Sequence, residues 1–134
     1  MPHALVLLLV CSVAVFVRGA AAGVVVTAVP QQDHLHFTVV ETREFVAGRV
    51  GTRCYEFVVP AVARVQAAQV ARFHSQYRGP DGTWDTRRGP VSGYIVMSPP
   101  RRPRAIEFRL RESWDDHVVP MSINGKHTVS LARR

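Results

Sequence analysis

Histidine residues near the start of the chain have a spacing that could support metal chemistry. His34 and His36 are two residues apart in an extended stretch, so both side chains should lie on one face of a strand. Glu41 could supply a third ligand only if a tight turn followed His36, but residues 37–40 are all strand formers. We therefore interpret the pair as exposed strand residues and predict no metal ion.

Two segments place a serine near a base or an acid. Ser75 follows His74, and Ser113 precedes the segment 115–117, which reads Asp-Asp-His. Neither serine has the flanking glycines that hold a nucleophile on a strained turn. The Asp-Asp-His segment could ligate calcium or zinc, but a polar loop is the simpler interpretation. The sequence therefore predicts a protein that is not an enzyme, with no catalytic residues, no metal and no cofactor.

Arginine is concentrated in the second half of the chain. The 134 residues carry a formal net charge of +7. A basic surface suits an acidic partner such as an acidic protein face, a sulfated glycan or a phospholipid surface. The alternative is a solvated edge that keeps the sheet from pairing with other chains. The candidate basic face comprises Arg87, Arg88, Arg101, Arg102, Arg104, Arg109 and Arg111.

Two tryptophans could add ligand stacking to this face. Trp84 and Trp114 each offer a flat ring of the kind that packs on a sugar. Trp84 follows a turn segment, Pro80-Asp81-Gly82, and this position favours filling the core beside that turn over ligand stacking.

The N-terminal segment 1–22 has the features of a signal peptide. Residues 4–17 are apolar or small, which is shorter than the roughly 20 residues needed to span a bilayer, and small residues follow at 19–22. An uncleaved anchor over residues 4–29 would bury Arg18 in the membrane. We expect cleavage, a location in the secretory pathway, no membrane span after signal removal and no nucleic-acid partner. Cleavage would leave Cys54 alone, as a buried strand residue or in an intermolecular disulfide.

Short β-patterned segments with turn residues between them fill residues 23–134. The strict alternation of residues 105–111 is typical of a half-buried antiparallel strand. Asn124-Gly125 predicts a two-residue hairpin turn between residues 118–123 and 127–131. Further strands are predicted at 24–29, 34–40, 45–50, 54–59, 68–77 and 93–98. The chain is thus expected to be all-β, a single antiparallel β-sandwich of about seven to eight short strands.

Several of these turn and strand residues also occur together in a known family. Asp81-Gly82-Thr83-Trp84 forms an Asp-Gly-small-aromatic turn, Gly93-Tyr94 opens the next strand, and Ser98-Pro99 leads to the alternating strand. Over residues 43–110 this order resembles the transthyretin-like or carboxypeptidase-regulatory-like β-sandwich. Within that family the chain is similar to the lumenal domains of the seventh subunits of the ER membrane protein complex.

The resemblance implies a non-enzymatic subunit in the ER lumen, associated with the ER membrane. Such a subunit would support the insertion of transmembrane proteins by docking on other subunits of a membrane-associated complex. Exposed edge strands and the basic face would supply the contacts. The alternative is an extracellular module that binds a carbohydrate or another acidic ligand with the same face. The lack of a second apolar run of spanning length after residue 22 favours that alternative.

Overall fold

The computed structural model describes residues 23–46, 48–78, 84–87, 91–114 and 117–132. Within them the chain is almost entirely extended, which confirms the all-β prediction. The strands are β1 (Gly23–Gln31), β2 (His34–Val46), β3 (Arg49–Pro60), β4 (Arg64–Gln66), β5 (Ala71–Arg78), β6 (Trp84–Arg87), β7 (Val91–Ser98), β8 (Ala105–Trp114), β9 (His117–Pro120) and β10 (Gly125–Leu131), with one 3₁₀ turn, η1 (Ala67–Gln69). Three of these strands, β4, β6 and β9, have only three or four residues.

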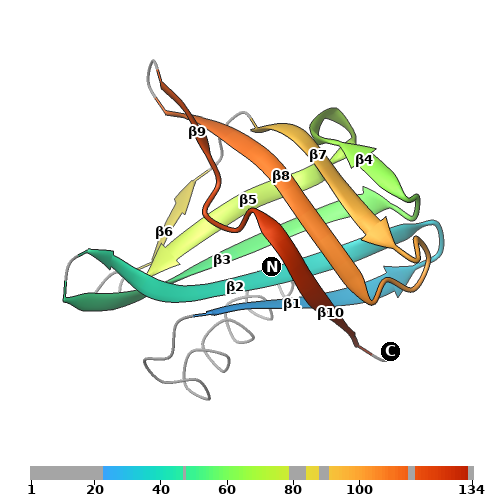
Figure 1. Ribbon diagram of the computed structural model, residues 1–134, viewed down its shortest axis with the longest axis horizontal. Coiled ribbons are helices and arrows are strands. Elements are labelled where there is room, and N and C mark those ends of the chain that lie inside the picture. The colour runs from blue at the N-terminus through green and yellow to red at the C-terminus, as the bar shows by residue number, and fades with distance from the viewer. Residues whose placement is uncertain (1–22, 47, 79–83, 88–90, 115–116, 133–134) are drawn as a thin grey trace.

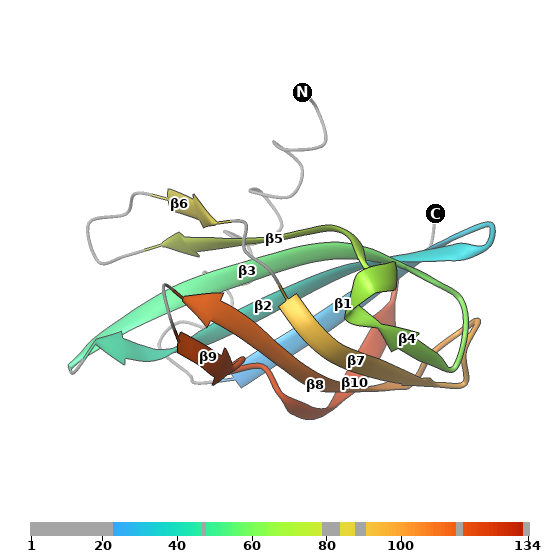
Figure 2. The ribbon, with the colours of Figure 1, turned by 90° about the horizontal axis from the view of Figure 1, so that it is seen from above.

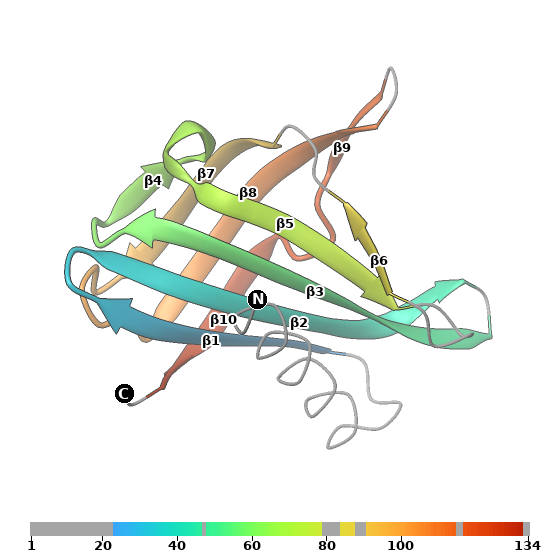
Figure 3. The same cartoon turned by 180° about the vertical axis from the view of Figure 1, so that it is seen from behind.

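The strands form one curled sheet in the order β4-β7-β8-β10-β1-β2-β3-β5-β6, with β9 paired to β8. The sheet folds over itself into two layers that face each other (Figures 1 and 2). We call β4, β7, β8, β9 and β10 the front layer, which faces the viewer in Figure 1. The back layer comprises β1, β2, β3, β5 and β6 and is seen from its outward side in Figure 3.

All strand pairs are antiparallel except one. β1 runs parallel to β10, with Val26 opposite Val129, and this pair joins the two layers. A parallel pair at this place departs from the purely antiparallel sandwich that the sequence predicted. It arises because the last strand returns to the first one from the opposite layer, which no local hairpin signal could indicate.

The core lies between the layers and is built by alternation. In β2 and β3 the odd-numbered residues point inward, and Phe37 stacks on Phe57 with ring centroids 5.2 Å apart. Phe108 of β8 meets Phe57 edge to face across the core at 5.9 Å. These rings are fully buried, and burying apolar area of this size is the main stabilising contribution.

β7 and β8 approach each other closely at one glycine. Gly93 lies opposite Leu110 and has a φ of +104°, and a Cβ atom there would stand 2.0 Å from the carbonyl oxygen of Arg109. No side chain fits that space, so the position requires glycine. The strands predicted at residues 93–98 and 105–111 are confirmed.

Two local predictions are wrong. Residues 45–50 were expected to form one strand, but they contain the turn between β2 and β3, where Gly48 has a φ of +76°. Asn124-Gly125 does not connect a hairpin, because β9 pairs with β8 rather than with β10. Instead the Asn124 side chain bonds the backbone of Leu110 twice, accepting from its N–H and donating to its carbonyl, both at 2.9 Å. The amide therefore replaces a missing strand partner.

The predicted segment 68–77 divides into the turn η1 and the strand β5, so the strand is confirmed from Ala71 onward. Cys54 is buried in β3 with 1% of its surface exposed, as expected, but its sulfur takes part in a disulfide. The other cysteine, Cys11, and the whole predicted signal peptide lie outside the described residues. Within the described part, no helix is long and apolar enough to cross a membrane.

Candidate docking surface

The predicted basic residues that the structure describes lie in three parts of the fold. Arg101, Arg102 and Arg104 are exposed in the connection between β7 and β8, at one end of β8. Arg109 and Arg111 are exposed on the outward side of β8 itself. Arg87 lies in β6, in the back layer, and its place on one face with the others stays a prediction. Its side chain and Arg88 lie outside the described part of the structure.

The tryptophans occupy strand ends in different layers. Trp84 is the first residue of β6, opposite Arg78, and Trp114 is the last residue of β8, opposite His117. Their side chains are outside what the structure describes, so ligand stacking by either ring stays a prediction.

Three neighbouring strands of the front layer bring together a cluster that the sequence did not indicate. The Arg64 guanidinium of β4 lies over the Tyr94 ring of β7, with its Cζ atom 4.0 Å from the ring centroid. Arg109 of β8 approaches the same ring from the other side of β7, with its Cζ 5.7 Å from the centroid. Its Nη1 donates to the Tyr94 hydroxyl at 2.9 Å. We call these three residues the Arg-Tyr-Arg cluster.

The outward side around this cluster is strongly basic. Arg111 of β8 and Lys126 of β10 point to the same side, because they alternate with the core residues of their strands. Among the outward positions described in β4, β7, β8 and β10, Glu107 is the one acidic residue. It accepts a hydrogen bond from Arg109 Nε at 3.0 Å. The bonds to Glu107 and then to Tyr94 raise the pKa of Arg109. Its guanidinium therefore stays charged.

An apolar spot adjoins the basic residues at the far end of β8. Val118 of β9 lies opposite Ser113, and Pro120 lies opposite Arg111, which places both on the outward side. Val118 has 60% of its surface exposed, the largest value among the exposed large hydrophobic residues of the described chain. Apolar surface bordered by arginine is typical of a protein-binding face.

The edges of the sheet are less available than the sequence suggested. At the β4 edge, the Gln66 backbone N–H donates to the Gln69 side chain at 2.9 Å. At β9, Pro120 has no N–H to offer a further strand. Both devices hinder the addition of a partner strand. Docking through edge strands is therefore less well supported than docking through the outward side chains of the front layer.

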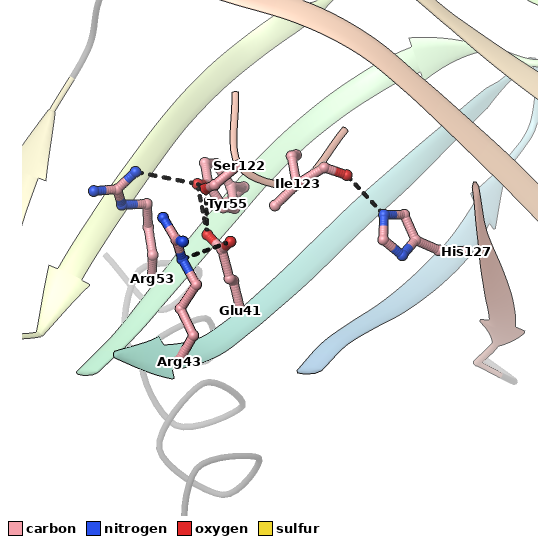
Figure 4. A network of polar contacts seen from close by, with 7 residues as sticks. All are labelled: Glu41, Arg43, Arg53, Tyr55, Ser122, Ile123 and His127. Atoms are coloured by element: carbon pink, nitrogen blue, oxygen red, sulfur yellow. Dashed lines mark hydrogen bonds and ion pairs between the residues drawn. The ribbon is translucent and has the colours of Figure 1, made fainter. Parts of the chain in front are cut away.

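A buried carboxylate joins the two layers below this surface (Figure 4). Glu41 of β2 is 2% exposed, and its Oε1 accepts from the Tyr55 hydroxyl at 3.1 Å and from Ser122 Oγ at 2.8 Å. Arg43 Nε lies 3.3 Å from the other carboxylate oxygen. Burial, followed by the nearby charge of Glu41, raises the pKa of Tyr55 to about 12. Tyr55 is thus a neutral donor, and the network ties the segment before β10 to the back layer.

The histidine pair has a protein partner. His36 Nε2 hydrogen-bonds to Glu56 Oε1 across β2 and β3. His34 lies near the turn that precedes β2, opposite Pro60. Among the described residues, no group of three or more histidine, cysteine or acidic side chains is arranged to hold a metal ion.

Comparisons with known proteins give no matching family model, no matching curated protein and no matching solved structure. The functional argument therefore depends on the chain's own residues, and above all on the outward side of the front layer.

Proposed function

We propose that this protein is a non-enzymatic docking module that binds an acidic surface of a partner protein through the outward side of its front layer. The observation that carries this proposal is the segregation of charge. Four basic residues face outward from β4, β8 and β10 beside one acidic residue, Glu107. Opposite charges across an interface accelerate encounter and select the partner. The four residues are Arg64, Arg109, Arg111 and Lys126.

The resemblance described above makes the proposal more specific. It supports a role in the ER lumen, as one subunit of a membrane-associated complex that supports insertion of transmembrane proteins. In that setting the partner surface belongs to a sister subunit. The exposed arginines of the β7–β8 connection extend the contact beyond the strands.

The test is a tagged pulldown from gently detergent-solubilised cells, with the culture medium assayed in parallel. We compare the wild type with the triple variant Arg101→Ser, Arg102→Ser, Arg104→Ser. These side chains are exposed, and the bonds that Arg104 makes to Ser98 and Val129 use only its backbone, so the melting temperature should not change. Recovery of multi-spanning membrane partners should fall, because part of the basic surface is lost.

A matched control is Arg49→Ser, which removes an exposed arginine at the β2–β3 turn. This variant should recover partners as well as the wild type does. A sharp fall in the melting temperature of the triple variant would make the connection structural and contradict its docking role. Free protein in the medium, without membrane partners, would overturn the placement in an ER complex.

A second candidate is an extracellular module for a sulfated glycan. Its support is the combination of arginine with the half-buried ring of Tyr94, which also suits a sulfated sugar. Retention on immobilised heparin that resists salt better than retention on a cation-exchange resin would favour this candidate.

A further inference from the structure

We propose that the Arg-Tyr-Arg cluster is a carboxylate clamp that holds an acidic side chain of an extended segment of the partner protein. This inference rests on the docking function proposed above and assigns the residues that recognise the partner. Arg64 was not among the residues that the sequence indicated. The clamp differs in position from the arginines of the β7–β8 connection, so the two can be tested separately.

The geometry fixes two guanidinium groups on one aromatic ring. Arg64 and Arg109 come from β4 and β8, the two strands that flank β7, which carries Tyr94. Their Cζ atoms lie 4.0 Å and 5.7 Å from the ring centroid, so the two groups are no farther apart than the sum of these distances. Stacking on the ring and the bond to the hydroxyl restrict both side chains before any partner arrives.

Enough hydrogen-bond donors remain to hold a carboxylate. A guanidinium group has about five N–H donors. Arg109 uses one at Nε for Glu107 and one at Nη1 for Tyr94. Within the described chain Arg64 contacts the Tyr94 ring and pairs with no carboxylate. A carboxylate that reached both groups past the hydroxyl edge of the ring would accept charge-assisted bonds from both, which are among the strongest polar contacts in proteins.

Glu107 competes with such a ligand. Its carboxylate occupies the Nε side of Arg109 and is more shielded than the arginine, with 22% of its side chain exposed against 59% for Arg109. It neutralises part of the charge and also holds Arg109 in place. Removing only its charge should therefore strengthen binding of an acidic segment.

The apolar spot on β9 sets the spacing of the partner residues. Val118 lies opposite Ser113, which is four residues beyond Arg109 on β8. At about 3.3 Å per residue in a strand, this separates the clamp from the apolar spot by roughly 13 Å along β8. An extended segment that follows β8 would thus place an apolar residue about four positions from its acidic residue. Arg111, between them, can meet a second acidic residue.

The experiment measures binding of a fluorescein-labelled extended peptide. It carries one Asp for the clamp, a second Asp two positions later for Arg111, and a Leu four positions after the first Asp for the apolar spot. A second peptide with Lys in place of Asp is the probe control. Arg64→Gln and Arg109→Gln should each weaken binding about tenfold, as expected for loss of a charge-assisted contact. Glu107→Gln should tighten it about threefold by the same charge argument. Arg49→Gln should change it by less than about twofold.

A direct readout comes from the nitrogen-15 spectrum of the arginine side chains. The Nε–H signals of Arg64 and Arg109 should shift on addition of the acidic peptide and stay in place with the lysine peptide. Thermal melts of every variant ensure that lost binding is not lost folding. Val118→Ser should weaken binding of the Leu peptide but not of a peptide with Ser at that position.

The outcomes separate the clamp from the docking function. If Arg101→Gln weakens binding while Arg64→Gln and Arg109→Gln do not, the clamp is wrong and the docking proposal stands. If the wild type binds the acidic peptide no better than the lysine peptide, both are wrong. If a heparin fragment or phosphatidylserine vesicles bind more tightly and lose binding in the same variants, the site takes another polyanion, and the assignment to a protein segment is overturned.

Discussion

The outward side of the front layer differs in charge from the outward side of β1, β2 and β3, although all these strands belong to one sheet. The outward positions of β4, β7, β8 and β10 carry Arg64, Arg109, Arg111 and Lys126. The outward positions described in β1, β2 and β3 carry no arginine or lysine, and their charged residues are acidic. They include His36 and Glu56, which pair with each other, and the buried Val40 and Cys54.

This difference bears on the origin of the arginines. The chain has many more arginines than lysines, and such a bias by itself would spread them over both outward sides. In β2 and β3 the arginines instead occupy inward-pointing positions near the rim, where Arg43 and Arg53 contact Glu41 and Tyr55. Among the strands compared, the placing of the arginines therefore reflects position as well as composition, which supports a binding role for the front layer.

The largest expected effect compares a glycine in each layer. Gly93→Ala should lower the free energy of unfolding by about 4 kcal/mol, because the new Cβ meets the Arg109 carbonyl at a positive φ. Gly48→Ala, at the β2–β3 turn, has a positive φ but open space and should cost only about 1 kcal/mol. Urea denaturation of both variants measures the difference. Equal losses of stability would show that the positive φ alone sets the cost of each substitution. They would also show that β7 and β8 can move apart to accept the new Cβ atom.

The next effect concerns the network that connects the layers. The pKa of Tyr55 rises from 10.0 to about 12 on folding, so the folded state holds its proton more tightly than the unfolded state does. Its contribution is complete below pH 10 and should be lost as the pH rises to about 12, at about 2 kcal/mol in all. Tyr55→Phe should flatten this alkaline loss. Parallel pH curves of wild type and variant in denaturant titrations would contradict the assignment.

Removal of the Glu41 carboxylate should lower the free energy of unfolding by a similar amount. Glu41→Ala leaves the Tyr55 and Ser122 hydroxyls without their shared acceptor, which should cost about 2 kcal/mol. The matched control is Glu44→Ala, an exposed acidic residue of the same strand, with a change within about 0.5 kcal/mol. If both variants lose the same stability by thermal unfolding, the network does not join the layers.

The smallest effect tests whether position or net charge matters. Thr27→Arg adds a positive charge to the outward side of the back layer, on β1 opposite Thr38. Binding of the acidic peptide should change by less than about twofold, because β1 is two strands away from β8 in the sheet and the new charge is screened by salt. A gain comparable to the loss in Arg64→Gln would mean that overall charge, rather than the cluster, governs binding.

Strands with strong local patterns could be predicted from the sequence. The alternation of residues 105–111 specifies both a strand and the side that each residue faces, and β8 follows it. The β2–β3 turn was missed because Gly48 lies inside an apolar run, with no proline, asparagine or aspartate to mark a turn. The Asn124-Gly125 pair indicates a turn only from neighbouring residues. It does not reveal that β9 pairs with β8, the strand that precedes it in the chain.

The candidate site was only partly predictable for the same reason. Arg109 and Arg111 were found because they belong to an alternating strand. Arg64 lies in a three-residue strand, which is too short to show a period, and it meets Tyr94 through pairing across some thirty residues of sequence. Only the folded sheet reveals that these two residues are neighbours.

The two hydrogen bonds between the Asn124 side chain and the Leu110 backbone have a consequence for where the chain can change in length. Together with the Met121 N–H, which also bonds the Leu110 carbonyl, they complete the hydrogen bonding of the front layer at that residue. β7 pairs with β8 as far as Glu112, and beyond it residues 113–114 and 117–118 form a two-stranded tip. The tip can therefore be lengthened by an inserted reporter sequence while the body of the sheet keeps its register and Arg111 and Val118 stay in place.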